Sequence, residues 1–277
     1  MDNKSIEIVQ VVKSVYGLDI SQYDDSFLTQ STEKRVAATG TTTISEYMQF
    51  VSDNPDEVAI LFRSLNITHT EFFRNSLSFA HLEQWILPSL LAAKSDNSEL
   101  RVWSAGCSSG QEAYSLAMLV ENLHIKKSRQ LRYRIIATDI CESALLHGIK
   151  GEYSENDIQN IRVKDLKEFF IKTGETYTVC DHLKNQVSFS SYDLLDNRSS
   201  YPQESIFGNF DLVVCSNMLF YYKPNHQHDI VKKLINSMDK GGYLITGETE
   251  RHTIEKFREL YQVAPPSPIY KLRRCMK

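Results

Sequence analysis

Two segments of the chain carry residue types that can hold a nucleoside. The first, residues 102–110, is typical of a strand that runs into a turn of small residues around Gly106, before a helix that begins near Glu112. Such a turn allows close approach to the backbone and directs the N–H groups of a helix N-terminus at a ligand. The second, residues 135–139, ends another strand with Asp139, where a carboxylate can accept hydrogen bonds from both hydroxyls of a ribose. Together the two segments predict a ligand that contains adenosine.

The form of the turn narrows the class of ligand. The turn does not match the G-x-G-x-x-G pattern of dinucleotide sites, and the sequence has no G-x-x-x-x-G-K-[ST] phosphate loop. S-adenosylmethionine is therefore favoured over a dinucleotide or a nucleoside triphosphate. Each segment alone also has a purely structural interpretation, because small-residue turns serve tight packing and an Asp at a strand end often caps the next helix.

The elements that must position these residues differ between the two parts of the chain. Residues 1–93 are predicted to form a helical domain and linker, because apolar residues recur at spacings of three and four. Asp53-Asn54-Pro55 is typical of a helix start. Residues 35–43, rich in Thr, interrupt the periodicity and are expected to be a connection.

Residues 94–277 are predicted to form an α/β domain with a parallel sheet, because short apolar runs alternate with helical patterns. Strands are expected at residues 100–103, 133–137, 186–189, 210–215 and 242–246. Helices are expected at residues 112–123, 143–149 and 227–238. The less regular stretch from about 152 to 194 is interpreted as an insertion, with a helix near 163–170 and a hairpin through 177–187.

Composition argues against several classes of protein. Of the 277 residues, 42% are hydrophobic and 24% charged, as in folded globular chains. The net charge of −4 argues against a nucleic-acid partner. No apolar run approaches the ~18 residues of a membrane-spanning helix, and no signal peptide is indicated, so a cytoplasmic location is expected. The five cysteines are scattered without a Cys-x-x-Cys pair, and no metal site is predicted.

Longer blocks of the sequence resemble the CheR chemotaxis receptor methyltransferases. Residues 70–74, Thr-Glu-Phe-Phe-Arg, are similar to the family's T-x-F-F-R block, and residues 104–115 to its S-A-G-C-S-[ST]-G-E-E-P-Y-S block. The similarity continues through residues 137–140, 151–153, 187–194, 210–222 and 241–244. The resemblance implies a Rossmann-like class I methyltransferase sheet with an N-terminal helical domain and a small antiparallel β-subdomain inserted at about residues 152–194.

The resemblance also implies an activity. Members of this family transfer the methyl group of S-adenosylmethionine to glutamate carboxylates of a chemoreceptor, which gives glutamate methyl esters and S-adenosylhomocysteine. The implied partner is the cytoplasmic domain of a methyl-accepting chemoreceptor, and a monomer without membrane insertion is expected. This chemistry needs no strong base, because a carboxylate is already ionised at pH 7. Two alternatives remain open: a methyltransferase of the same fold that acts on another carboxylate, and a regulatory module that senses S-adenosylmethionine without turnover.

The same resemblance assigns roles to individual residues. Arg74 and Tyr221 match positions beside the transferred methyl group and are predicted to be catalytic. Glu112 falls where the family binds the amino group of the methionine part, and Asp139 where it holds the ribose. The remaining predicted cofactor-binding residues are Thr68, Thr70, Arg74, Ala105, Gly106, Asp193, Leu194, Ser216 and Asn217.

The chain departs from the family pattern at several positions. The departures are Thr68, Gln111, Ala113, Asp193 and Ser216, together with Gly247-Glu248-Thr249-Glu250 in place of G-H-S-E. None of them removes a residue with an assigned catalytic role, so enzymatic activity is expected. Ser216 replaces an Arg and lowers the positive charge expected near the ligand, which leaves the identity of the substrate open.

Overall fold

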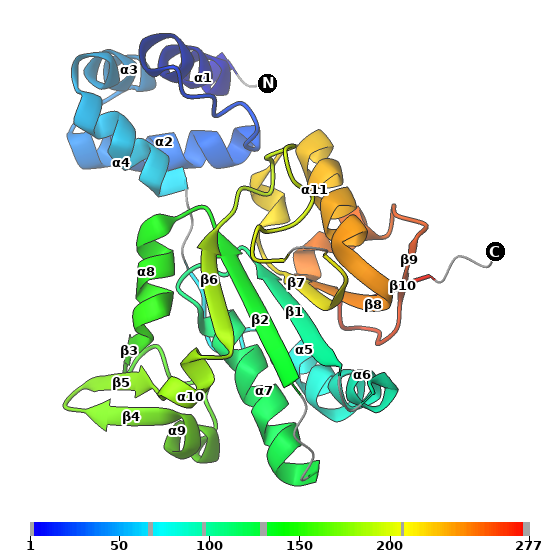
Figure 1. Ribbon diagram of the computed structural model, residues 1–277. Helices are drawn as coiled ribbons and strands as arrows, with labels where there is room; N and C mark the ends of the chain where they lie inside the picture. The colour runs from blue at the N-terminus through cyan, green and yellow to red at the C-terminus, as the bar shows by residue number, and fades with distance from the viewer. Residues whose placement is uncertain (1–2, 66–68, 96–97, 128–131, 206–207, 274–277) are drawn as a thin grey trace. The chain divides into compact units, whose positions relative to one another are not determined.

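The computed structural model describes residues 3–65, 69–95, 98–127, 132–205 and 208–273 (Figure 1). The chain divides into two compact units. The N-terminal unit combines residues 1–67 with 219–228, and the second unit combines residues 68–218 with 229–277. The boundary expected at residue 93 therefore lies inside the second unit.

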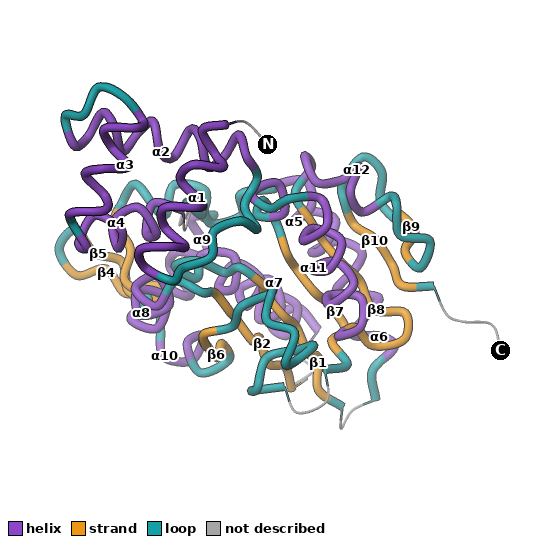
Figure 2. Tube along the Cα trace, turned by 90° about the horizontal axis from the view of Figure 1, so that it is seen from above, coloured by secondary structure: helices purple, strands orange, loops and turns teal. Residues whose placement is uncertain are grey.

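The N-terminal unit is built from α1 (Asn3–Tyr16), α2 (Asp25–Thr39), α3 (Ile44–Asp53) and α4 (Pro55–Leu65). In Figure 2 these four segments carry the colour of helices. The apolar residues at helical spacing meet in one core, which includes Ile8, Val12, Leu28, Tyr47, Val51, Val58 and Leu61. The sequence-based prediction of a helical domain is thus confirmed for these residues.

Helix α2 extends further than the sequence indicates. Residues 35–39 were expected to lie in a connection, but they form the last turns of α2, which ends at Gly40 with a φ of 75°. The Thr39 hydroxyl donates to the Arg35 carbonyl at 2.9 Å, so this Thr satisfies a helix-end acceptor. The prediction is wrong here because the low helical propensity of Thr is outweighed by packing and by such local bonds.

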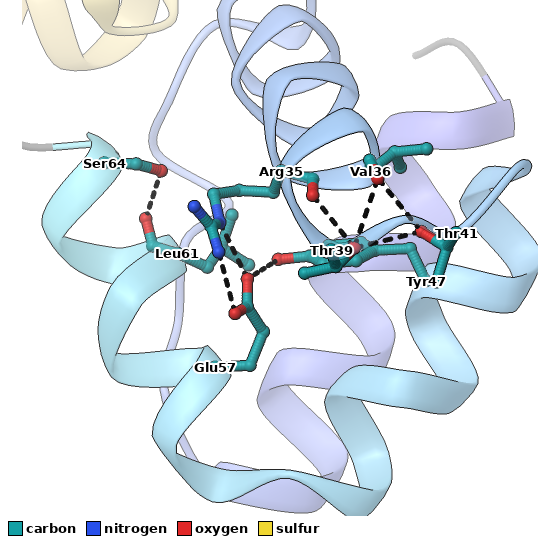
Figure 3. Close-up of polar contacts among 8 residues, drawn as sticks. All are labelled: Arg35, Val36, Thr39, Thr41, Tyr47, Glu57, Leu61 and Ser64. Carbon is teal, nitrogen blue, oxygen red and sulfur yellow. Dashed lines mark hydrogen bonds and ion pairs between the residues drawn. The ribbon is translucent and has the colours of Figure 1, made fainter.

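A buried polar network joins three of these helices (Figure 3). Arg35 on α2 donates from Nε to Glu57 Oε1 at 2.8 Å and from Nη2 to Oε2 at 2.9 Å. The Tyr47 hydroxyl on α3 donates to Glu57 Oε1 at 2.8 Å. Burial alone would raise the pKa of Glu57 on α4, but the bonds from Arg35 and Tyr47 outweigh it and the pKa lies below its ordinary value. The ion pair therefore fixes how α2, α3 and α4 pack together.

The second unit contains a seven-stranded sheet in the order β6-β2-β1-β7-β8-β10-β9 (Figure 1). The strands are β1 (Glu99–Ala105), β2 (Arg132–Asp139), β6 (Val187–Ser191), β7 (Phe210–Cys215), β8 (Met238–Thr246), β9 (Leu260–Gln262) and β10 (Ile269–Leu272). Pairs β6-β2, β2-β1, β1-β7 and β7-β8 are parallel, whereas β10 pairs with β8 and β9 in antiparallel fashion. This is the predicted Rossmann-like sheet, with antiparallel strands at one edge.

Helices connect the parallel strands and precede the sheet. The principal connections are α7 (Gln111–Lys127), α8 (Glu142–Lys150) and α11 (Pro224–Ser237). Before β1 lie α5 (Ser76–His81), a π-helical turn (Leu82–Ile86) and α6 (Leu87–Ala93). After β8, a 3₁₀ turn (Glu248–Glu250) runs into α12 (Arg251–Ile254). All of β7 and the carboxyl-terminal halves of β1 and β2 are mostly buried, as expected for the centre of a parallel sheet.

The insertion forms a small antiparallel sheet in the order β3-β5-β4. It contains β3 (Glu152–Ser154), α9 (Val163–Phe169), β4 (Phe170–Thr173), β5 (Thr176–Val179) and α10 (Asp181–Lys184). The small sheet and helix α9 were predicted, but the hairpin through residues 177–187 is wrong. Its turn lies at Gly174, whose φ is 62°, and residues 181–184 are helical. Among the described residues, no helix is long and apolar enough to cross a membrane.

Candidate active site

The predicted site residues of the second unit follow the carboxyl ends of four adjacent parallel strands. Gly106 follows β1, Asp139 ends β2, Asp193 and Leu194 follow β6, and Asn217 follows β7. The chain passes from β1 to β2 and then β6 on one side of β1, and it continues with β7 and β8 on the other side. The direction of the strand order therefore reverses between β1 and β7. Ligands of open α/β sheets bind at the carboxyl edge beside such a reversal.

The turn after β1 lies close to the end of β2 and to the loop after β7. Gly106 has a φ of 75°, and its N–H donates to the Thr138 carbonyl at the end of β2 at 2.8 Å. The Cys107 N–H donates to the same carbonyl at 2.9 Å. A Cβ on Gly106 would lie 2.8 Å from Met218 Sδ, in the loop after β7. Glycine is required here by both the backbone conformation and the close neighbour.

Asp139 connects the ends of β1 and β2. Its Oδ2 accepts the Ser108 N–H at 2.8 Å, and its Oδ1 accepts the Cys141 N–H at 2.9 Å. Burial raises the pKa of Asp139, although these backbone donors oppose the effect. Each carboxylate oxygen still has acceptor capacity beyond its backbone donor. The side chain is therefore held in place while it remains able to accept hydroxyl donors.

Glu112 is a half-buried acid in the first turn of α7. Its Oε1 accepts a hydrogen bond from the Ser104 hydroxyl of β1 at 2.7 Å. Burial, with a smaller effect of the charge of Glu250, raises the pKa of Glu112 to about 7, although the Ser104 hydrogen bond and the charge of Arg74 oppose this rise. A carboxylate with a pKa this high gains most from a cation that binds beside it.

The loop after β7 is fixed by Glu250, a residue to which the sequence analysis gave no role. Glu250 Oε1 accepts the Met218 N–H at 2.7 Å, and Oε2 accepts the N–H groups of Asn217 at 3.1 Å and Gly247 at 2.6 Å. Asn217 has a φ of 61°, in the left-handed region that non-glycine residues seldom adopt. The buried Glu250 carboxylate thus fixes the backbone of the loop that follows β7 at the carboxyl edge of the sheet. The signal in the sequence was the block at residues 247–250, which follows β8 directly.

Arg74 is presented by a turn that the two preceding aromatic residues anchor. Phe72 and Phe73 are buried in the core of the second unit. Phe73 has a φ of 52°, and its N–H donates to the Ser115 hydroxyl of α7 at 3.1 Å. Arg74 itself is exposed, and its Nη1 donates to the His69 carbonyl at 3.3 Å. The core therefore fixes the backbone while the guanidinium remains accessible.

The other predicted residues have varied environments. Ala105 and Leu194 are buried, Thr70 and Ser216 are half-buried, and Asp193 is exposed with its Oδ1 accepting the Leu195 N–H at 2.8 Å. Thr68 lies outside the described residues. Tyr221 belongs to the N-terminal unit, where its ring packs against Phe27. The second unit thus brings Gly106, Glu112, Asp139 and Asn217 to one edge of its sheet.

A Rossmann-like sheet with these acids at its carboxyl edge is the arrangement expected of a class I S-adenosylmethionine-dependent methyltransferase. Residues 68–265 match the S-adenosylmethionine-binding domain of CheR methyltransferase, and residues 6–65 match its all-alpha domain. The chain therefore belongs to the CheR methyltransferase family. The predictions of this family, its fold and its cofactor are confirmed.

Three relatives illustrate the similarity along the chain. The chemotaxis protein methyltransferase of Borreliella burgdorferi is 28% identical over 93% of this chain and 90% of its own length. That of Listeria monocytogenes is 28% identical over 91% of both chains. Chemotaxis protein methyltransferase 1 of Pseudomonas aeruginosa is 32% identical over 76% of both chains. The similarity thus extends over both compact units.

The residues of the second unit fit the cofactor chemically. S-adenosylmethionine carries a positively charged amino group and a ribose, and it has no phosphate. Glu112 provides a half-buried acceptor for a cation, and Asp139 provides a fixed acceptor for hydroxyl groups. A site with two acids and a glycine turn suits this combination better than it suits a polyphosphate.

Proposed function

We propose that the chain methylates glutamate side chains on the cytoplasmic domain of a chemoreceptor. The proposal is carried by the half-buried Glu112, which the Ser104 hydroxyl holds at 2.7 Å and whose pKa is raised to about 7, at the carboxyl edge of a CheR-family sheet, where it suits a cationic ligand. The names of the related chemotaxis methyltransferases support the choice of a chemoreceptor over another carboxylate. The assignment of individual residues follows the family motifs that they match.

When bound, S-adenosylmethionine would supply the methyl group for the glutamate oxygen, and S-adenosylhomocysteine would leave with the electrons of the broken carbon–sulfur bond. Glu112 would hold the amino group of the cofactor by charge, and Asp139 would hold the ribose. Gly106, Ala105 and Leu194 would allow the close approach of the nucleoside to the sheet edge. Thr68, Thr70, Asp193, Ser216 and Asn217 are proposed to complete the cofactor site.

The two proposed catalytic residues would act on the glutamate of the receptor. Arg74 would orient the carboxylate through its planar guanidinium, and Tyr221 would donate one hydrogen bond. Neither residue needs to remove a proton, because the glutamate reacts in its ionised form. Their contribution is orientation in line with the methyl group, together with exclusion of water from two opposite charges that disappear in the reaction.

The decisive experiment is a labelling assay. The purified chain is incubated with S-adenosylmethionine labelled with tritium in its methyl group and with membranes that carry receptors from the same cell. We expect receptor-bound label that base releases as volatile methanol, and an Arg74→Ala variant should lose about 10²-fold in turnover. No base-labile label on any receptor would refute the proposal.

Two other outcomes identify the alternatives. Turnover on a carboxylate that is not part of a receptor would indicate a same-fold methyltransferase with another substrate. Binding of S-adenosylmethionine that survives Arg74→Ala, with no transfer by the unaltered chain, would indicate a regulatory module.

A further inference from the structure

The segment that carries Tyr221 is part of the N-terminal unit by its backbone bonds. Residues Tyr23 and Tyr222 form an antiparallel bridge. The Tyr221 carbonyl accepts the Asp24 N–H at 2.8 Å, and the Lys223 N–H donates to the Gln22 carbonyl at 2.9 Å. These bonds attach residues 221–223, far along the sequence, to the connection between α1 and α2.

Side chains strengthen the same attachment. The ring of Tyr221 packs against Phe27 with centroids 4.8 Å apart, and the ring of Tyr222 stacks on Tyr23 at 5.4 Å. Lys223 Nζ lies 3.1 Å from Asp25 Oδ1. Aromatic pairs with these separations add to the stability that area burial gives. The backbone and the side chain of Tyr221 are therefore both fixed by the start of α2.

The start of α2 is itself rigidly built. Asp24 is the N-cap of the helix, and its Oδ1 accepts the Ser26 N–H at 2.9 Å. Leu28, one residue beyond Phe27, is buried in the core of the N-terminal unit. A capped helix end that is anchored in a core provides a stable support for a neighbouring segment.

We propose that the N-terminal helical unit positions the catalytic tyrosine, with Phe27 as the principal positioning residue. The inference rests on the proposed function, because it takes Tyr221 as a residue that acts on the substrate. The glutamate and the cofactor need not touch Phe27 for this role. Loss of the Phe27 ring removes the contact that holds the Tyr221 ring against the start of α2, and a displacement of about 1 Å in a reacting group can cost about 10²-fold in rate.

The experiment compares two substitutions of Phe27 with a matched control. Phe27→Ala removes the ring that contacts Tyr221, and Phe27→Tyr retains it on a side chain that is only half-buried. Phe50→Ala is the control, because Phe50 is also half-buried and packs on the same core from α3. The full-length chain is used throughout, with receptor-bearing membranes and labelled S-adenosylmethionine.

We expect Phe27→Ala to lower kcat at least 10-fold while the dissociation constant of S-adenosylmethionine changes less than 3-fold. Phe27→Tyr should restore kcat, and Phe50→Ala should leave it within 3-fold of the unaltered chain. Hydrogen exchange of the peptide that contains residues 219–223 should accelerate in Phe27→Ala and stay unchanged in Phe50→Ala. A merely structural role for Phe27 would change kcat equally in both alanine variants.

The outcomes separate this inference from the proposed function. Normal turnover by the unaltered chain, with kcat unchanged in Phe27→Ala, would overturn the positioning role alone. Absence of receptor methylation by the unaltered chain would overturn the proposed function, and hydrogen exchange then decides the positioning role. In that case, unchanged exchange of residues 219–223 in Phe27→Ala overturns it as well.

Discussion

Replacement of Glu112 by Gln should stabilise the ligand-free protein at neutral and alkaline pH. In the folded chain, Glu112 retains its proton up to about pH 7, whereas its ordinary pKa is 4.5. Between pH 4.5 and about pH 7, the unfolded state binds fewer protons than the folded state, so the free energy of unfolding falls as the pH rises. Gln has nearly the same shape, still accepts the Ser104 hydrogen bond and cannot ionise, so the variant lacks this loss.

The size of the effect follows from the interval between the two pKa values. The interval from 4.5 to about 7, at about 1.4 kcal/mol per pH unit, corresponds to about 3 kcal/mol. Most of this difference accumulates between pH 5 and pH 8. Relative to the unaltered chain, Glu112→Gln should therefore gain about 2 kcal/mol in free energy of unfolding between these pH values.

Urea unfolding at pH 5 and pH 8, in the absence of S-adenosylmethionine, measures this gain. Glu259→Gln is the matched control, because Glu259 is exposed, and its stability should follow that of the unaltered chain. If Glu112→Gln and the unaltered chain lose stability in parallel as the pH rises, the burial argument for Glu112 is wrong.

The same ionisation should govern cofactor affinity. A cationic amino group binds the ionised form of Glu112, so binding must expel the proton when the pH is below about 7. The affinity for S-adenosylmethionine should then fall about 10-fold per pH unit below that value. Calorimetry at several pH values measures the slope, which Glu112→Gln should abolish while it weakens binding at pH 8.

Three further substitutions test other parts of the structure. Asp139→Ala should weaken S-adenosylmethionine binding by about 1–3 kcal/mol, through loss of charge-assisted hydrogen bonds; unchanged affinity in calorimetry would contradict the ribose assignment. Gly40 and Gly106 share a φ of 75°, and replacing Gly40 by Ala should cost about 1–2 kcal/mol for this backbone conformation alone. Gly106→Ala should destabilise the protein by more, because its new Cβ would also meet the Met218 side chain. Equal losses of stability in urea unfolding would exclude that clash. Glu57→Gln should cost about 3 kcal/mol in the same measurement, since it breaks a buried ion pair, and a loss below about 1 kcal/mol would show that the pair of Figure 3 contributes little.

The elements that bury a regular apolar pattern could be predicted from the sequence. Strand β7 was predicted with its observed bounds, and helices α7 and α8 within a few residues at each end. Strands β9 and β10 were missed, because short antiparallel strands carry little periodic signal. Strand β4 was missed for a related reason, since only one of its four residues is buried.

The candidate site was predictable where a motif falls at the end of a strand. Gly106 and Asp139 could be placed in this way, because parallel strands present their carboxyl ends at one edge. The role of Glu250 could not, since its bonds to Asn217 and Met218 join residues more than thirty positions apart. The raised pKa of Glu112 likewise depends on burial that the sequence does not specify.

The residues before Tyr221 and Tyr221 itself are held by contacts within different compact units. Glu250 fixes the backbone of Asn217 and Met218 within the second unit, and the start of α2 fixes Tyr221 within the N-terminal unit. Residues 219 and 220 separate these two stretches. If Tyr221 acts on the substrate, substitutions in the N-terminal helices should change turnover without changing cofactor affinity, because every proposed cofactor-binding residue lies in the second unit.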